Sequence, residues 1–327
     1  MRPRSLLILA AAVPALFCAC SCSQDDNIIV TPPATMPTNE LGITRFIAMG
    51  DGGEGNDTQY AVSRAVEGVC EASGCDFVLY MGDNIYSDGA ESPTDPMFES
   101  RFELPYENLD LPFYVVLGNH DYGGNSAMFW RAQHEIDYTE HSEKWNMPSA
   151  YYTFRYGDVQ LFGLDTNALM WGMSSAQEAW FSREVAASEV GWKVAFGHHP
   201  YRSNGRHGNA GDYEGFSHIP VASGNSIQRF FEERMCGEVD LYLCGHDHNR
   251  QWIDGGCRDE DGEGLTTELI VSGTAAKTTD LADRGNPVHF ENDEIAGFVW
   301  VEATSQEITA VFYDELGNEE FRRVVGR

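Results

Sequence analysis

The sequence predicts an α/β fold with parallel strands whose carboxyl ends carry the functional residues. Five apolar runs, each flanked by polar turns, have the length and composition of buried strands. These runs are Phe46–Met49, Phe77–Met81, Phe113–Leu117, Val194–Phe196 and Leu241–Cys244. Helical patterns fall between some of the runs, and an alternation of strands with helices is typical of a parallel sheet.

Two segments between the expected strands have the pattern of helices. From Val62 to Val69, apolar residues recur at helical spacing after Asp57, which is a suitable N-cap. Farther along, Ser175 and Glu178 have the spacing of a capping box, in which serine and acid satisfy the free amides of the first turn. A helix is therefore expected after each of these N-terminal signals.

Each of the five runs is followed by glycine and then by aspartate, asparagine or histidine. The residues after these glycines are Asp51, Asp83, Asn119 with His120, His198, and His246 through His248. A lone aspartate after a strand is usually a helix cap or a turn residue. Five such turns are hard to explain by capping preference, and ligands bind outside the carboxyl ends of strands in open α/β sheets. We therefore expect the five turns to converge on one metal-binding crevice.

The composition limits the classes of substrate. The 327 residues, with 42% hydrophobic content, are enough for one large core, and no internal repeat or compositional break suggests a second domain. The formal net charge is −30, and such a surface repels nucleic acid and anionic lipid. DNA and RNA are therefore not expected as substrates, although solubility explains the charge equally well.

The N-terminal segment has the parts of an export signal. Two arginines precede an apolar run from Leu6 to Phe17 that is too short to span a bilayer, and small residues and cysteines follow. Residues 1–22 are interpreted as an export or lipoprotein-type signal. Cys20 or Cys22 would be the lipidated residue, and simple secretion without a lipid is the alternative. Residues 23–42 are polar and proline-rich and are expected to form a flexible tether. The protein is thus expected in the periplasm, at the cell surface as a lipoprotein, or secreted.

Five cysteines lie beyond this segment: Cys70, Cys75, Cys236, Cys244 and Cys257. Disulfides are expected in an exported protein, and the odd number leaves one thiol free. We predict the pairs Cys70–Cys75 and Cys236–Cys257. The second pair follows if strand 240–243 and a returning strand 251–253 are antiparallel neighbours, because positions 236 and 257 then lie opposite each other. Cys244 lies within an apolar strand and is predicted to be free and buried.

The motifs after the strands resemble the five signature blocks of the purple acid phosphatase family. The blocks are Asp51-Gly52-Gly53, Gly82-Asp83-Asn84-Ile85-Tyr86, Gly118-Asn119-His120-Asp121, Gly197-His198 and Gly245-His246-Asp247-His248. The wider metallophosphoesterase superfamily shares most of the blocks, and Tyr86 is the feature that marks the purple branch. The likeness is greatest to the small mammalian, tartrate-resistant type. It implies a four-layer sandwich of two mixed β-sheets flanked by helices, with residues 43–327 as the metallophosphoesterase catalytic domain.

The resemblance implies two metal sites that share one carboxylate. One ion would be bound by Asp51, Tyr86 and His248 and the other by Asn119, His198 and His246, with Asp83 bridging them. The first set has two anionic oxygens of its own, whereas the second set is neutral. Hard anionic oxygens favour a trivalent ion, and neutral nitrogen-rich ligands suit a divalent one. The expected cofactor is therefore Fe(III) plus a divalent metal, which is Fe, Zn or Mn.

The expected activity is two-metal hydrolysis of phosphate monoesters at acidic pH by a metal-bound hydroxide. His120 belongs to the third block without being a family ligand and is expected to contact the phosphate oxygens or the leaving group. His207 lies where the mammalian-type enzymes carry a second active-site histidine. Either histidine could protonate the departing alkoxide. His199 is expected to support the site or pack behind it.

Two other functions use the same sequence features. A phosphodiesterase or nucleotidase would have the same metal centre, because the blocks determine the hydrolytic chemistry and not the leaving group. A surface lipoprotein that binds metal or phosphate without catalysis usually lacks a ligand or an acid, and this sequence has the full set. We expect a monomer that acts on a small phosphate ester and contacts a membrane only through a lipid anchor.

Overall fold

The computed structural model describes residues 29–30, 42–124, 126–215, 221–255, 257, 267–282 and 284–327. The predicted signal, residues 1–22, lies outside the described residues. Within the predicted tether, residues 23–42, Ile29–Val30 form a short strand, β1, that pairs in parallel with β6 (Tyr152–Tyr156). Residues 23–28 and 31–41 of that tether lie outside the described residues.

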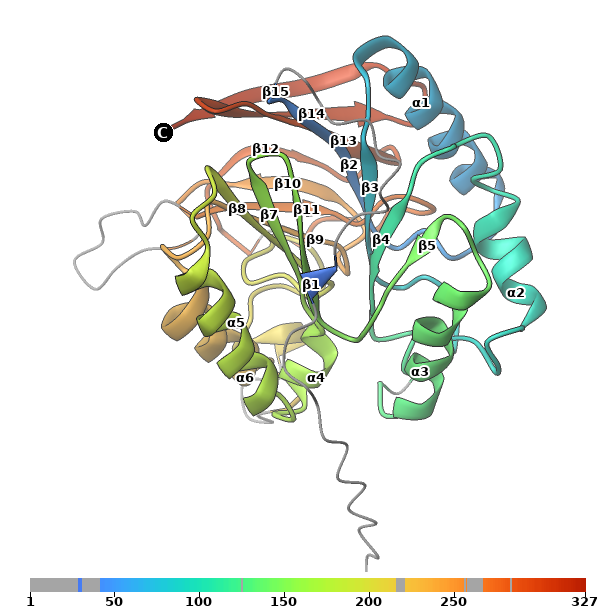
Figure 1. Cartoon of the computed structure of the whole chain (residues 1–327), viewed down its shortest axis with the longest axis horizontal. Coiled ribbons are helices and arrows are strands. Elements are labelled where there is room, and N and C mark those ends of the chain that lie inside the picture. Colours follow the sequence, from blue (N-terminus) through green and yellow to red (C-terminus); the bar gives the residue numbers. More distant parts are fainter. Residues whose placement is uncertain are drawn as a thin grey trace, which may run out of the picture.

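Two mixed β-sheets form the centre of the molecule (Figure 1). The strands of the first sheet are β2 (Thr44–Met49), β3 (Phe77–Met81), β4 (Phe113–Val116), β5 (Trp145–Asn146), β13 (Gly297–Ala303), β14 (Glu307–Asp314) and β15 (Glu319–Gly326). Besides β1 and β6, the second sheet contains β7 (Val159–Gly163), β8 (Trp192–Phe196), β9 (Leu241–Cys244), β10 (Arg250–Ile253), β11 (Glu268–Ser272) and β12 (Val288–Asn292). The strand orders are β15-β14-β13-β2-β3-β4-β5 and β1-β6-β7-β8-β9-β11-β10-β12.

All five strands expected from the apolar runs are present, and they occupy the parallel parts of both sheets. In the first sheet β2, β3 and β4 run parallel to one another. In the second sheet β8 and β9 are parallel neighbours, and β7 and β11 extend the parallel region on either side. The predicted α/β class is confirmed, and the five functional turns come from two sheets that face each other.

Helices cover the outer faces of both sheets, which gives four layers (Figure 1). The helices are α1 (Asp57–Ser73), α2 (Pro96–Phe98), α3 (Phe129–Asp137), α4 (Thr166–Met170), α5 (Ser175–Ala187) and α6 (Asn225–Phe230), with short helical segments η1 (Glu99–Glu103), η2 (Tyr138–Glu140), η3 (Tyr213–Gly215) and η4 (Phe231–Met235). Among the described residues, no helix is both long and apolar enough to cross a membrane.

Both predicted helix caps are wrong by one residue. Asn56 is extended, with φ −98° and ψ 172°, and its side chain accepts a hydrogen bond from the Gln59 amide at 2.9 Å, so Asp57 is already the first helical residue of α1. Ser174 likewise precedes α5, but its side chain caps no backbone amide, and its hydroxyl donates to the Glu178 carboxylate at 2.9 Å. Asparagine and serine stand directly before the predicted caps, and the sequence pattern alone does not distinguish such neighbours.

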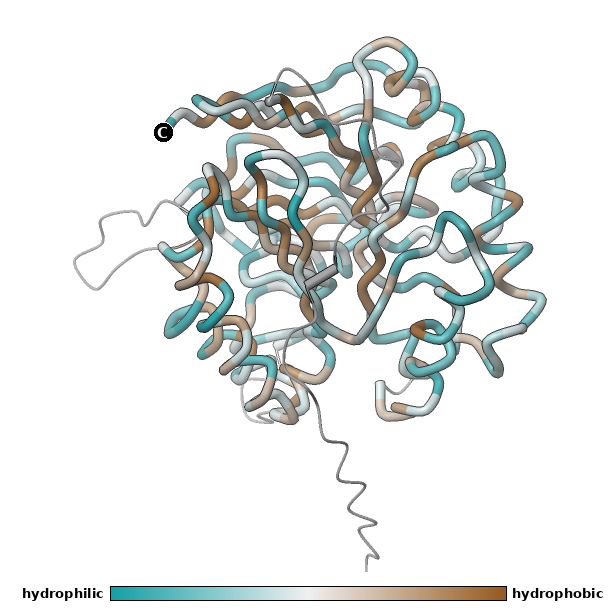
Figure 2. The backbone as a smooth tube through the Cα atoms, in the orientation of Figure 1, coloured by the Kyte–Doolittle hydropathy of each residue, from teal (hydrophilic) through white to brown (hydrophobic). Residues whose placement is uncertain are grey.

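Aromatic side chains between the sheets hold the two layers together. Figure 2 shows apolar residues gathered along the central strands and hydrophilic ones along the helices and loops. Phe77 of β3 stacks on Phe46 of β2, with ring centroids 5.2 Å apart, and meets Phe154 of β6 edge-on at 5.6 Å. All three side chains are fully buried. Burial of each stabilises the sandwich by about 1.5–3 kcal/mol.

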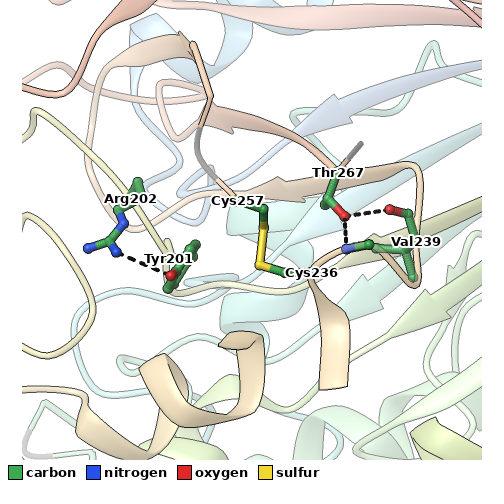
Figure 3. Close-up of a disulfide and its surroundings, with 7 residues drawn as sticks. Tyr201, Arg202, Cys236, Val239, Cys257 and Thr267 are labelled. Carbon is green, nitrogen blue, oxygen red and sulfur yellow. Dashed lines mark hydrogen bonds between the residues drawn. A yellow bond between two sulfur atoms is a disulfide. The ribbon is translucent and has the colours of Figure 1, made fainter. Parts of the chain in front are cut away.

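The cysteines pair as predicted, but the strand pairing expected to bring Cys236 opposite Cys257 is wrong. Cys70–Cys75 and Cys236–Cys257 are disulfides, and Cys244 is free and buried. β9 and β10 are not neighbours, because β11 lies between them, parallel to β9 and antiparallel to β10. Beside the Cys236–Cys257 bridge, the Thr267 hydroxyl accepts from the Gly237 amide at 2.9 Å (Figure 3). β11, which begins at Glu268, follows Thr267 and lies directly beside β9.

Candidate metal centre

The functional turns of both sheets meet at one edge of the sandwich. After β2, the Asp51 amide donates to the Gly82 carbonyl beyond β3 at 2.9 Å. After β9, the Gly245 amide donates to the His198 carbonyl beyond β8 at 3.1 Å. These backbone bonds fix the turns relative to one another, as expected for the carboxyl ends of neighbouring parallel strands.

Three of the turns place a functional residue in the left-handed region of backbone conformation. The φ angles are 62° for Asp51, 54° for Asp83 and 70° for His246. Side chains other than glycine rarely adopt this conformation, and it costs about 1–3 kcal/mol where the surrounding structure enforces it. The preceding Gly82 also has a positive φ, and a Cβ there would lie 2.7 Å from Nδ1 of His198. The glycines found in the sequence thus allow the backbone and a ligand ring to approach closely.

The first predicted set of ligands converges on the Tyr86 hydroxyl. This oxygen lies 2.9 Å from Oδ2 of Asp83, 3.1 Å from Oδ1 of Asp51 and 3.4 Å from Nε2 of His248. Asp51, Asp83 and Tyr86 are all buried, and His248 is nearly so. Asp51, Asp83 and His248 also offer ligand atoms that all lie within 4.8 Å of one another.

The second predicted set converges on Nε2 of His198. Nε2 lies 3.1 Å from Oδ1 of Asn119, 3.1 Å from Nδ1 of His246 and 3.4 Å from Oδ1 of Asp83. The other ring nitrogen, Nδ1, donates to the Met81 carbonyl at 2.9 Å. Although burial opposes protonation, Asp83 and Asp51 raise the pKa of His198, and a protonated Nε2 can donate to Oδ1 of Asn119. A metal ion would take the place of this proton between the two atoms.

Both sets fit metal ions. Ligand atoms that each lie about 2.1 Å from one ion at right angles are about 3 Å apart, which is the spacing found in each set. The oxygens of Asp51 and Asp83 flank the Tyr86 phenol, and burial together with these carboxylates raises the pKa of the phenol far above its usual value. A phenol whose pKa is raised in this way is deprotonated only when it binds a strongly acidic cation. Although burial opposes ionisation, His198 and His120 lower the pKa of Asp83, which keeps this shared group anionic.

The two predicted catalytic histidines lie on different sides of these ligands. The His120 ring packs against the Tyr86 ring, with centroids 4.6 Å apart, and its Nδ1 is 2.5 Å from the Ser87 carbonyl. Its Nε2 is 4.0 Å from Oδ2 of Asp83. The His207 ring instead lies 4.0 Å from the ring of His246, near the second set.

Glu214, which belongs to none of the five blocks, holds His207. Nδ1 of His207 lies 2.8 Å from Oε1 of Glu214, and the Glu214 amide donates back to the His207 carbonyl at 2.8 Å. Glu214 has a φ of 53°, which is rare for a residue other than glycine. Asp247 holds the other side of the loop, because its carboxylate accepts from the His207 and Gly208 amides at 2.8 and 3.3 Å.

Buried acids beneath the site join the turns of β3 and β4. Asp121 accepts hydrogen bonds from the amides of Asn84, Ile85 and Gly118 at 2.7–3.1 Å. Asn84 also donates through its side chain to Glu135 of α3 at 3.0 Å. Burial, followed by repulsion from neighbouring carboxylates, raises the pKa of both Asp121 and Glu135. Asp121 was visible in the third block, but nothing in the sequence pattern pointed to Glu135.

His199 packs behind the ligands, as expected. Its side chain is fully buried, its ring lies 4.5 Å from that of His246, and Nδ1 is 2.8 Å from the Thr166 hydroxyl. The same hydroxyl accepts from the His198 amide at 3.2 Å. Thr166 thus supports the backbone that carries a ligand.

Comparison with known proteins identifies the family. The model of the calcineurin-like phosphoesterase family matches residues 44–250, which contain all five blocks. The chain belongs to this family. It is an enzyme of metal-dependent phosphoester hydrolysis, and the expected resemblance to purple acid phosphatases is confirmed by curated relatives.

Those relatives match most of the chain. Tartrate-resistant acid phosphatase type 5 of Mus musculus is 27% identical over 92% of this chain and 96% of its own length. Purple acid phosphatase 3 of Arabidopsis thaliana is 28% identical, covering 86% of this chain and 77% of that protein. Among solved structures, GAP50, described as the anchor in the inner membrane complex of Plasmodium, has a TM-score of 0.64 at 20% identity, with 87% and 89% covered. This likeness supports the four-layer fold.

Proposed function

We propose that this enzyme hydrolyses phosphate monoesters with two metal ions. One ion is held by Asp51, Tyr86 and His248, the other by Asn119, His198 and His246, and Asp83 lies between them. The observation that carries the proposal is the convergence of these donor atoms on two points, at separations of 2.9–3.4 Å. The names of the acid phosphatase relatives support the choice of monoesters.

The charges of the two sets support a mixed Fe(III)–M(II) pair. Tyr86 and Asp51 give the first set two anionic oxygens once the phenol is deprotonated, and such hard donors favour Fe(III). Asn119 is a neutral donor, and burial, followed by the nearby His207 and His199, lowers the pKa of His246. Although burial opposes protonation, Asp83 and Asp51 raise the pKa of His198, so this ring is a neutral donor once a metal ion has displaced its proton. A neutral set suits Fe²⁺, Zn²⁺ or Mn²⁺.

The protein side chains bind the phosphate and move the proton. The two ions, when bound, would polarise the phosphoryl oxygens and activate the attacking water. His120 lies beside Asp83 and its Nδ1 donates to the Ser87 carbonyl, so Nε2 donates to a phosphoryl oxygen when the ring is protonated. His207 has Nδ1 held by Glu214, so its Nε2 is available to protonate the leaving alkoxide.

Export and a monomeric state belong to the same proposal. The disulfides Cys70–Cys75 and Cys236–Cys257 support an oxidising compartment, as in the periplasm, at the cell surface or outside the cell. Lipidation at Cys20 or Cys22 would add a membrane anchor, and intact mass measurement of the exported protein distinguishes it from simple secretion.

The test uses the colour of the iron-loaded protein. Aerobically purified protein should contain two metal ions per chain and absorb visible light through charge transfer from the Tyr86 phenolate to Fe(III). Tyr86→Phe should lose this band while circular dichroism shows the fold retained. Wild-type protein that is fully loaded with iron and colourless would contradict the assignment of Tyr86.

Substrate class needs a separate measurement on the same protein. Turnover of matched phosphate monoesters and diesters, both with the same phenol as leaving group, compares the two activities directly. A clear preference for the monoester supports the proposal, whereas a preference for the diester would make the protein a phosphodiesterase or nucleotidase. Metal-loaded protein inactive on both would indicate a non-catalytic binding role.

A further inference from the structure

A lysine lies over the face of the Tyr86 ring. Lys277, in the connection between β11 and β12, places its Nζ 3.3 Å from the centroid of that ring. At this distance a cation interacts with the π electrons of the aromatic ring. Neither the sequence blocks nor the ligand sets include Lys277.

Two contacts hold the lysine in this place. Its Nζ donates to Oε1 of Glu54 at 2.7 Å, and Glu54 lies in the turn that carries Asp51. The neighbouring Ala276 carbonyl accepts from the Asn56 side chain at 2.9 Å. The ammonium group of Lys277 and the backbone beside it thus both contact the segment that follows β2. Only 28% of the lysine side chain is exposed.

Lys277 contacts the ring of Tyr86, and its ion pair is with Glu54 and not with the carboxylates of the first set. Within the described residues, the ion pairs of Asp51 and Asp83 are formed with histidines, and Lys277 pairs with Glu54. In the part of the chain that the structure describes, no lysine or arginine forms an ion pair with Asp51 or Asp83, and Lys277 faces the tyrosine ring.

We propose that Lys277 tunes the Tyr86 phenolate as a metal ligand. A positive charge over the ring stabilises the electrons of the phenolate, so the phenolate donates less charge to the bound ion. Removal of an electron from the ring then needs more energy, and the charge-transfer band lies at shorter wavelength. The bound Fe(III) is also easier to reduce, because a weaker anionic donor stabilises the trivalent state less. This inference rests on the proposed function of Tyr86.

The experiment compares visible spectra of aerobically purified, metal-analysed proteins. Lys277→Met keeps the length of the side chain and removes the charge, and it should shift the band to longer wavelength, by on the order of 10 nm for a cation–π contact of ordinary strength. Lys277→Arg keeps a cation that can stack on the ring and should return the band toward that of the wild type. Lys193→Met, in β8 at the opposite end of the strands, is the matched control and should leave the band in place.

Each result has a distinct meaning. An unshifted band in Lys277→Met at full metal content would overturn the inference and leave the metal centre intact. Wild-type protein without a band would instead contradict the proposed function itself. Lys277→Gln provides a second neutral variant if the methionine variant does not fold. The reduction potential gives an independent readout, and it should fall in either neutral variant and stay unchanged in Lys193→Met.

Discussion

Replacement of His207 by alanine tests the proposed proton donor directly. The loop that carries His207 does not depend on the imidazole, because the His207 and Gly208 amides are held by Asp247 at 2.8 and 3.3 Å. The side chain is also 26% exposed, so its removal leaves little buried cavity. We therefore expect the alanine variant to fold and to keep its metal ions.

The expected loss is that of general-acid catalysis, and it depends on the leaving group. Loss of a positioned acid lowers turnover by about 10²- to 10⁴-fold, which corresponds to about 3–5 kcal/mol of transition-state stabilisation. An alkyl alcohol is a poor leaving group without a proton, whereas a phenol such as para-nitrophenol departs readily. The loss in His207→Ala should therefore be much larger for alkyl phosphates than for aryl phosphates.

The assay measures kcat and kcat/KM on both substrates, with metal content determined on the same samples. His141→Ala, an exposed histidine outside the site, is the matched control and should retain activity on both. His120→Ala should lose activity on both substrates to a similar extent if it binds the phosphoryl oxygens. Equal losses for alkyl and aryl phosphates in His207→Ala, with metal retained, would refute the proton-donor role and make this histidine a positioning group.

Two further predictions concern stability. Replacement of both Cys236 and Cys257 by serine opens a link across 21 residues and should lower the free energy of unfolding by about 3 kcal/mol. The shorter Cys70–Cys75 link spans 5 residues, so its removal should lower the free energy of unfolding by only about 2 kcal/mol, as measured by urea unfolding. A larger loss for the shorter link than for the longer one would contradict the loop-length argument. Burial raises the pKa of Asp165 to about 6. The native state therefore binds the proton of this carboxyl more tightly than the unfolded chain does. The free energy of unfolding should fall as pH rises from about 4 to about 6. In Asp165→Asn the free energy of unfolding should fall by about 3 kcal/mol less over this pH range. A pH profile of stability that is unchanged by the substitution would show that Asp165 ionises normally.

The sequence was informative wherever a functional residue follows directly from its strand. Asp51 and Asp83 come after glycine at the end of a buried run, and Tyr86 lies three residues beyond Asp83. In such turns the identity of the residue and its position at the edge of the sheet are set by a few neighbouring residues. The strand-glycine-ligand pattern therefore predicted that these turns meet, whereas Tyr86 and the division of the ligands into two sets were implied by the resemblance to purple acid phosphatases.

Residues that act through contacts distant in the sequence could not be predicted. Glu54 and Lys277 are 223 positions apart, and Asn84 and Glu135 are 51 apart, so their pairing depends on how the layers pack. The insertion of β11 between β9 and β10 was missed for the same reason. A run such as Glu268–Ser272 predicts a strand but does not specify its neighbours.

The division of the proposed ligands between the two sheets explains why a sandwich suits this chemistry. The turns of the first sheet contribute Asp51, Asp83, Tyr86 and Asn119, which are oxygen donors, and those of the second contribute His198, His246 and His248, which are nitrogen donors. Each ion needs donors from both sheets, so the site is complete only while the two layers are packed. Binding energy at the metals then also stabilises the interface between the sheets. Because the anionic oxygens come from one side and most neutral donors from the other, packing of the two sheets would place the proposed trivalent site beside the proposed divalent one.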